Sequence, residues 1–237
     1  MKRRKRRRRA GLNTATKIKI AAAIAAYPII MIALVGISTV CMTVDRMDNM
    51  LHGRYGDTTE SKLEHFLDNM DESLLARFER DGGSIMLTKT DAITVEDIES
   101  RGAKAANAEI IQEKGATGVY SHSEQVIRIA DDASNGTFYH EFGHYIDDTL
   151  GMEYLGHKFS ESESFCIIAE NEIADFNKKM HHYNASDYSL RCYELSQKFS
   201  EYFAESFECY LMSPRYLKYV APATYAYMDA LYQALVQ

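Results

Sequence analysis

The sequence predicts an α+β fold: a mostly helical domain with one small β-hairpin, preceded by one transmembrane helix. Several segments repeat apolar residues at the three-to-four-residue spacing of helices that bury one face. Two short apolar runs flank a polar turn at 122–124, which is typical of a hairpin. A third run, residues 20–44, carries no charge at all. The composition, 46% hydrophobic and 26% charged, is that of a globular protein.

The N-terminal segment is predicted to anchor the chain in a membrane. Residues 1–19 carry ten Lys and Arg and no acidic residue. As a helix, residues 20–44 would span about 37 Å, enough to cross a hydrocarbon core of about 30 Å. The basic tail keeps the N-terminus cytoplasmic. We therefore expect a cytoplasmic tail, a single-pass signal-anchor at 20–44 in the cell membrane, a linker at 45–56 and a domain outside at 57–237. The alternative is secretion after cleavage near Ser38, which ends a small-x-small triplet.

The charge balance argues against nucleic acid as a partner. Residues 45–237 carry 17 Lys and Arg and 34 Asp and Glu, a formal charge of 17 − 34 = −17. A phosphate backbone would repel such an acidic body. The expected contacts are therefore with the membrane, through residues 20–44, and with proteins or peptides.

The first part of the domain is expected to alternate helices with short strands. A capping box at Asp57 to Glu60 starts a helix over 58–80, which Gly82-Gly83 ends. Further elements follow in order: a strand at 84–88, a short helix at 95–101, and hairpin strands at 118–121 and 125–130. The hairpin edge either binds an extended peptide by β-augmentation or is ordinary core. The pattern favours neither reading.

The chemistry of the chain is concentrated in the segment TFYHEFGHY at 137–145, which contains His-Glu-x-x-His. If it is helical, His140 and His144 lie one turn apart and point the same way. Two imidazoles so placed can bind one Zn²⁺, and Glu141 can take a proton from water that the metal activates. The motif therefore predicts a zinc metallopeptidase.

Capping residues and apolar spacing predict the bounds of this motif helix and of the helices after it. Asn135 and Thr137 supply N-cap chemistry, and Gly151 is expected to stop the helix after Leu150. The spacing places four apolar residues toward the core, namely Phe138, Phe142, Tyr145 and Ile146. Three more helices are expected at 162–180, at 194–212 before Ser213-Pro214, and from Pro222 to about Leu235.

A catalytic zinc needs a third protein ligand. The metzincin continuation is absent, because Asp147 and Leu150 stand where Gly and His are required. The acidic stripe of Glu201, Glu205 and Glu208 on the 194–212 helix is either a solvated face or part of the site. In the second case Glu201 binds zinc and Glu205 accepts a hydrogen bond from a zinc-bound histidine. Spacing leaves seven candidates for the third ligand: Asp147, Asp148, His157, His181, His182, Glu201 and Glu205.

A second motif, FSEYFAESF at 199–207, resembles the signature of the anthrax lethal factor-like zinc metallopeptidases. That family includes secreted Pro-Pro endopeptidases. The stretches 211–214 and 221–225 are similar to the family's C-terminal helices, so the resemblance covers roughly 57–237. It implies a zincin-like domain of the gluzincin type. It also implies His140, His144 and Glu201 as zinc ligands and Glu141 as the base.

The resemblance further implies a tyrosine that stabilises the oxyanion. At the position where the family has this tyrosine, the chain has Glu194. The prediction therefore falls on the adjacent Tyr193, with Tyr188 as the second candidate. The expected activity is hydrolysis of peptide bonds in extracytoplasmic proteins or peptides. The alternative is a non-catalytic, zinc-stabilised and membrane-tethered binding or sensory domain. Glu141 favours the enzyme, because a purely structural zinc site needs no base.

Overall fold

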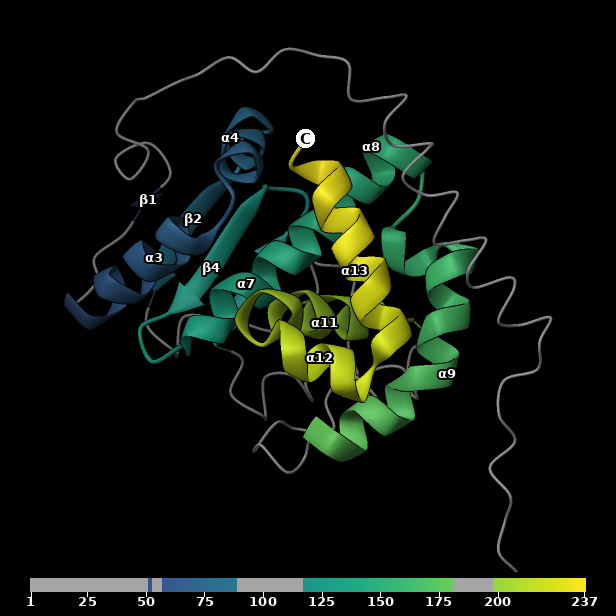
Figure 1. Cartoon of the computed structure of the whole chain (residues 1–237). Coiled ribbons are helices and arrows are strands. Elements are labelled where there is room, and N and C mark those ends of the chain that lie inside the picture. The colour runs from purple at the N-terminus through teal and green to yellow at the C-terminus, as the bar shows by residue number, and fades with distance from the viewer. Residues whose placement is uncertain (1–50, 53–56, 89–116, 181–197) are drawn as a thin grey trace, which may run out of the picture.

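A computed structural model describes residues 51–52, 57–88, 117–180 and 198–237 (Figure 1). The predicted membrane segment, 20–44, and the predicted short helix, 95–101, lie outside the described residues. Among the helices that are described, none is both long enough and apolar enough to cross a membrane.

The described strands form one small sheet of four, with spatial order β1-β2-β4-β3. β2 pairs in parallel with β1 and β4, and β3 pairs with β4 in the predicted antiparallel hairpin, which is confirmed. β1 comes from the predicted linker. β3 lies at one edge of this described sheet. The strands are β1 (Leu51–His52), β2 (Ser84–Thr88), β3 (Gly118–Ser121) and β4 (Val126–Ala130).

Helices make up most of the fold, which confirms a mostly helical domain with a small sheet. α7 lies between the sheet and the C-terminal helices α11, α12 and α13 (Figure 1). The α-helices are α3 (Asp57–Asn69), α4 (Glu72–Arg80), α7 (Asn135–Tyr145), α8 (Gly151–Leu155), α9 (Glu163–Met180), α11 (Ser200–Met212), α12 (Pro214–Val220) and α13 (Pro222–Leu235). A π-helical turn, η2 (Ile146–Leu150), joins α7 to α8, and a 3₁₀ turn, η3 (Phe159–Glu161), precedes α9.

The single helix predicted over 58–80 is wrong, because Asp71 divides it into α3 and α4. Asp71 has extended backbone, and its carboxylate accepts a hydrogen bond from the Ser73 N–H at 2.8 Å. This is an N-cap, which starts a new helix. The apolar spacing continues across the break, since Phe66 and Phe78 on either side are both buried. Periodicity alone therefore could not reveal the division.

The predicted stop at Gly151 is also wrong. Gly151 has helical dihedral angles and begins α8, and the helix ends at Gly156, whose φ of 75° is left-handed. Gly151 is required for another reason. An added Cβ there would lie 2.7 Å from the backbone nitrogen of Phe159 and 2.9 Å from Cα of Lys158. A close backbone approach, not a helix end, accounts for the glycine.

The variant Gly151→Ala should therefore destabilise the domain, although alanine normally favours a helix by about 1 kcal/mol over glycine. The clash is with backbone atoms, and overpacking of this kind costs about 1–3 kcal/mol. Urea unfolding should show a lower midpoint than wild type. Gly156→Asn is the matched variant, because asparagine tolerates left-handed backbone and should cost less. An unchanged midpoint for Gly151→Ala would contradict the close approach.

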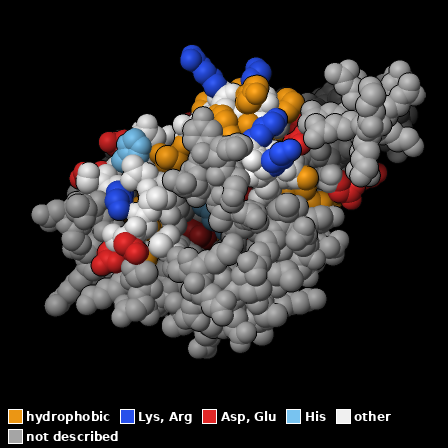
Figure 2. Space-filling view, turned by 90° about the horizontal axis from the view of Figure 1, so that it is seen from below, with side chains coloured by type: hydrophobic (Ala, Val, Ile, Leu, Met, Phe, Trp, Pro, Cys, Tyr) orange, Lys and Arg blue, Asp and Glu red, His pale blue; other side chains and the backbone are white. Residues whose placement is uncertain are grey.

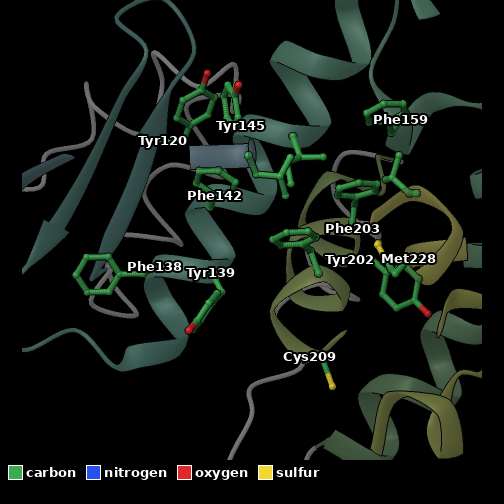
Figure 3. Close-up of a cluster of buried hydrophobic side chains, with 14 of the residues drawn as sticks. Tyr120, Phe138, Tyr139, Phe142, Tyr145, Phe159, Tyr202, Phe203, Cys209 and Met228 are labelled. Atoms are coloured by element: carbon green, nitrogen blue, oxygen red, sulfur yellow. The ribbon is translucent and has the colours of Figure 1, made fainter. Parts of the chain in front are cut away.

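An aromatic core holds α7 in place (Figure 3). Phe142 on α7 contacts Phe66 of α3, Phe78 of α4 and Phe207 of α11, with ring centroids 5.7, 5.4 and 6.5 Å apart. Such pairs stabilise a core beyond the burial of their area. The predicted core face of the motif helix is confirmed, because all four residues are at most 1% exposed: Phe138, Phe142, Tyr145 and Ile146.

Candidate metal centre

α7 presents the two motif histidines on one side. Its N-cap is Ser134 rather than the predicted Asn135 or Thr137, since the Ser134 hydroxyl accepts the Thr137 N–H at 3.3 Å. The rings of His140 and His144 have centroids 4.9 Å apart and planes at 80°. The predicted helical arrangement of the motif is therefore present.

Close packing of α7 on α11 brings the third group to these histidines. An added Cβ at Gly143 would lie 3.1 Å from Cα of Ala204 and 3.3 Å from Cβ of Phe207. Small residues at such a crossing allow two helix backbones to approach closely. Glu201, in the first turn of α11, then faces both imidazoles.

The three side chains converge at separations that suit a metal ion. Glu201 Oε2 lies 3.3 Å from His140 Nε2 and 3.5 Å from His144 Nε2. Two atoms bound at 2.0–2.1 Å to one tetrahedral centre lie roughly 3.4 Å apart. Among the described residues, these three form a group whose ligand atoms all lie within 4.8 Å of one another. Two histidines and one carboxylate are a donor set that fits catalytic zinc.

The electrostatics of the group favour a positive charge at its centre. Burial lowers the pKa of His140, but the hydrogen bond with Glu201 and the carboxylates of Glu141, Glu201 and Glu208 outweigh it, and the pKa rises to about 9. Figure 2 shows acidic and histidine atoms within a hollow on the underside of the molecule. The fields that raise this pKa also attract a metal cation.

Glu141 lies where the motif predicts, next to His140 and only 3% exposed. Its carboxylate packs against the start of β3. An added Cβ at Gly118 would lie 2.8 Å from Cγ and 2.9 Å from Oε1 of Glu141. Gly118 therefore leaves the space that this side chain occupies.

Several other candidates for the third ligand are engaged elsewhere. Asp147 accepts hydrogen bonds from the Ser160 N–H at 2.6 Å and the Ser160 hydroxyl at 2.7 Å. Asp148 pairs with Lys158, and His157 Nδ1 lies 2.8 Å from the Lys158 carbonyl oxygen. These groups hold the segment after the motif helix in place. His181 and His182 lie outside the described residues, as do Tyr188 and Tyr193.

The structure adds one carboxylate that spacing did not single out. Glu208 Oε2 lies 3.7 Å from His140 Nδ1, on the side of the ring away from Glu201. The role predicted for Glu205, as acceptor for a zinc-bound histidine, stays a prediction. The one sequence signal for Glu208 was its place on the same acidic stripe, two turns after Glu201.

Asp147 gives a testable pH dependence. Burial raises its pKa to about 7, against hydrogen bonds from Ser160 and the charge of Lys158, while Asp148 adds to the rise. The folded state then binds this proton more tightly than the unfolded state. The contribution of Asp147 to stability should therefore be largest below about pH 4 and fall as the pH rises to about 7, by about 1.4 kcal/mol per pKa unit.

The variant Asp147→Asn should flatten that fall, because an amide keeps an acceptor for the Ser160 N–H but cannot ionise. The measurement is the free energy of unfolding in urea at several values between pH 4 and pH 7. An equally steep fall in Asp147→Asn and wild type would assign the dependence to other groups.

Comparison with known proteins places the chain in a family. Its sequence matches the family described as anthrax toxin lethal factor, N- and C-terminal domain, over residues 45–231. The fold is similar to that of the Pro-Pro endopeptidase from Paenibacillus alvei, with a TM-score of 0.52 and 20% identity. That match covers 79% of this chain and 100% of the other. Among proteins with curated descriptions, none matches. The chain is a member of the anthrax toxin lethal factor family.

Proposed function

We propose that the protein is a zinc-dependent metalloendopeptidase. The observation that carries this proposal is the convergence of His140, His144 and Glu201, in which the Glu201 carboxylate lies at tetrahedral separations from both histidines. Glu141 adjoins the first histidine. Zinc, when bound, supplies Lewis-acid chemistry toward water and the scissile carbonyl. The solved protein of similar fold is named a Pro-Pro endopeptidase, which supports the same class of reaction.

Each of these residues would have its own role in peptide hydrolysis. His140, His144 and Glu201 hold the metal. Glu141 accepts a proton from the attacking water and delivers it to the leaving amine, which is general acid–base catalysis. Tyr193 is proposed to donate a hydrogen bond to the oxyanion. These roles need no further cofactor.

The edge of the sheet supports a peptide as the substrate. β3 lies at one edge of the described sheet, and Gly118 at its start contacts Glu141. An extended peptide that adds to this edge by main-chain hydrogen bonds would pass close to the proposed base. We propose this edge as the path of the substrate backbone.

We also propose that residues 20–44 anchor the enzyme, with the catalytic domain on the outer side of the cell membrane. The uncharged run and the basic tail before it support this orientation. Expressed in bacteria, the chain should stay in the membrane fraction after carbonate washing, with an intact mass that includes the basic tail. A soluble product that begins after Ser38 would replace anchoring with secretion.

The test of activity is digestion of a mixed peptide library by the full chain in detergent, read by mass spectrometry. We expect cuts with zinc, none after chelation, and recovery when zinc is restored. Glu141→Gln protein provides the background of contaminating proteases. Zinc-loaded protein that cuts neither peptides nor proteins would favour the non-catalytic binding domain.

A further inference from the structure

We propose that Glu208 is the positioning residue for His140, and that Gly136 provides the space that holds its carboxylate. This inference rests on the proposed function, because it concerns the orientation of His140 as a zinc ligand. Glu208 itself does not bind the metal.

The first observation is that the two ring nitrogens of His140 face two different carboxylates of α11. Nε2 lies 3.3 Å from Glu201 Oε2, and Nδ1 lies 3.7 Å from Glu208 Oε2. The second distance is slightly longer than a hydrogen bond and too short for a water molecule between the atoms. The Glu208 carboxylate is therefore the direct neighbour of Nδ1.

This placement selects the form of the imidazole that can bind a metal. A neutral imidazole carries its proton on one nitrogen, and the other nitrogen keeps the lone pair. An ionised carboxylate only accepts hydrogen bonds, so Glu208 favours the proton on Nδ1. The lone pair then lies on Nε2, toward Glu201 and the metal position. Acceptors in this position orient metal-binding histidines and increase their basicity.

The second observation is the space above Gly136, one turn before His140 on the same side of α7. An added Cβ at Gly136 would overlap Glu208 Oε1 and lie 2.9 Å from Glu208 Cδ, and Met212 Sδ would lie at 3.4 Å. The carboxylate therefore occupies the volume that any other residue at position 136 would fill. Glu208 is held between Gly136 and His140, 34% exposed at its side chain.

The experiment measures the zinc dissociation constant of the full chain by competition with a chromophoric chelator. For Glu208→Ala we expect binding 10- to 100-fold weaker than wild type, the usual effect of removing such an acceptor. Glu208→Gln should lose less, because its amide oxygen can still accept the Nδ1 proton. Glu170→Ala, which removes an exposed carboxylate on α9, should bind zinc like wild type. Wild-type zinc affinity in Glu208→Ala would overturn the inference.

A double-mutant cycle with Gly136→Ala tests the role of the space itself. The added methyl displaces the end of a flexible side chain, so it should weaken zinc binding without lowering the thermal stability of the metal-free protein. Once Glu208 is alanine, Gly136→Ala should have no further effect on zinc. Additive effects of the two substitutions would show that Gly136 does not act through Glu208.

The outcomes separate this inference from the proposed function. If wild-type protein binds no zinc, the metallopeptidase proposal fails and the role of Glu208 with it. If wild type binds zinc and both Glu208→Ala and Gly136→Ala bind it equally well, only the positioning role is overturned. Thermal unfolding of each metal-free variant identifies a loss of binding that comes from misfolding, and Glu208→Gln then decides the result.

Discussion

The variant Glu141→Gln should bind zinc like wild type and hydrolyse peptides about 10²- to 10⁴-fold more slowly. The expected loss is the usual contribution of a general base. An amide cannot take up the proton of the attacking water. The carboxylates of Glu201 and Glu208 have their own positions toward the histidines.

The substitution should leave the fold unchanged, which makes the loss of activity interpretable. Glu141 is 3% exposed and fills the space left by Gly118. Glutamine has the same length and volume, so it keeps this packing, whereas alanine would leave a cavity. Bound zinc, measured by mass spectrometry of the acid-treated protein, should be equal in wild type and Glu141→Gln. Full turnover in Glu141→Gln would remove Glu141 from the mechanism.

Local spacing was sufficient to predict the elements whose causes are local. The hairpin follows from two apolar runs around a polar turn, and the motif helix follows from its apolar spacing. The break at Asp71 could not be predicted in this way, because the burial pattern of α3 continues into α4. The predicted helix end at Gly151 was wrong for a related reason. A glycine after a helix usually marks its end, but here it permits the chain at Phe159 to pass close to the helix.

Only the part of the site that lies on a single helix could be predicted from sequence spacing. His140, Glu141 and His144 follow from five consecutive residues, but the partner carboxylates lie on α11, about sixty residues later. Spacing on α11 makes Glu201, Glu205 and Glu208 equivalent members of one stripe. What distinguishes them is the close crossing of α7 and α11, at Gly143 and Ala204. That crossing is a tertiary contact, so no periodicity along α11 could reveal it.

Removal of Glu201 should weaken zinc binding more than removal of a residue that does not bind the metal. We expect Glu201→Ala to weaken zinc binding more than the 10- to 100-fold typical of residues outside the ligand set. Its Oε2 is the atom that faces both His140 Nε2 and His144 Nε2, so two histidines alone would remain. Peptide hydrolysis should then be lost at zinc concentrations that saturate wild type.

The shortened variant Glu201→Asp distinguishes the effect of side-chain length from the effect of charge. It keeps a carboxylate but withdraws it by one methylene, and a tetrahedral site tolerates little change in a bond of about 2.0–2.2 Å. We expect zinc binding between those of Glu201→Ala and wild type, with Glu170→Ala, an exposed change on α9, unaffected. Wild-type affinity in Glu201→Ala would mean that the third ligand is another residue. The metal would then lie away from the point where α7 and α11 bring these three side chains together, and the assignment of Glu141 as base would lose its geometric support.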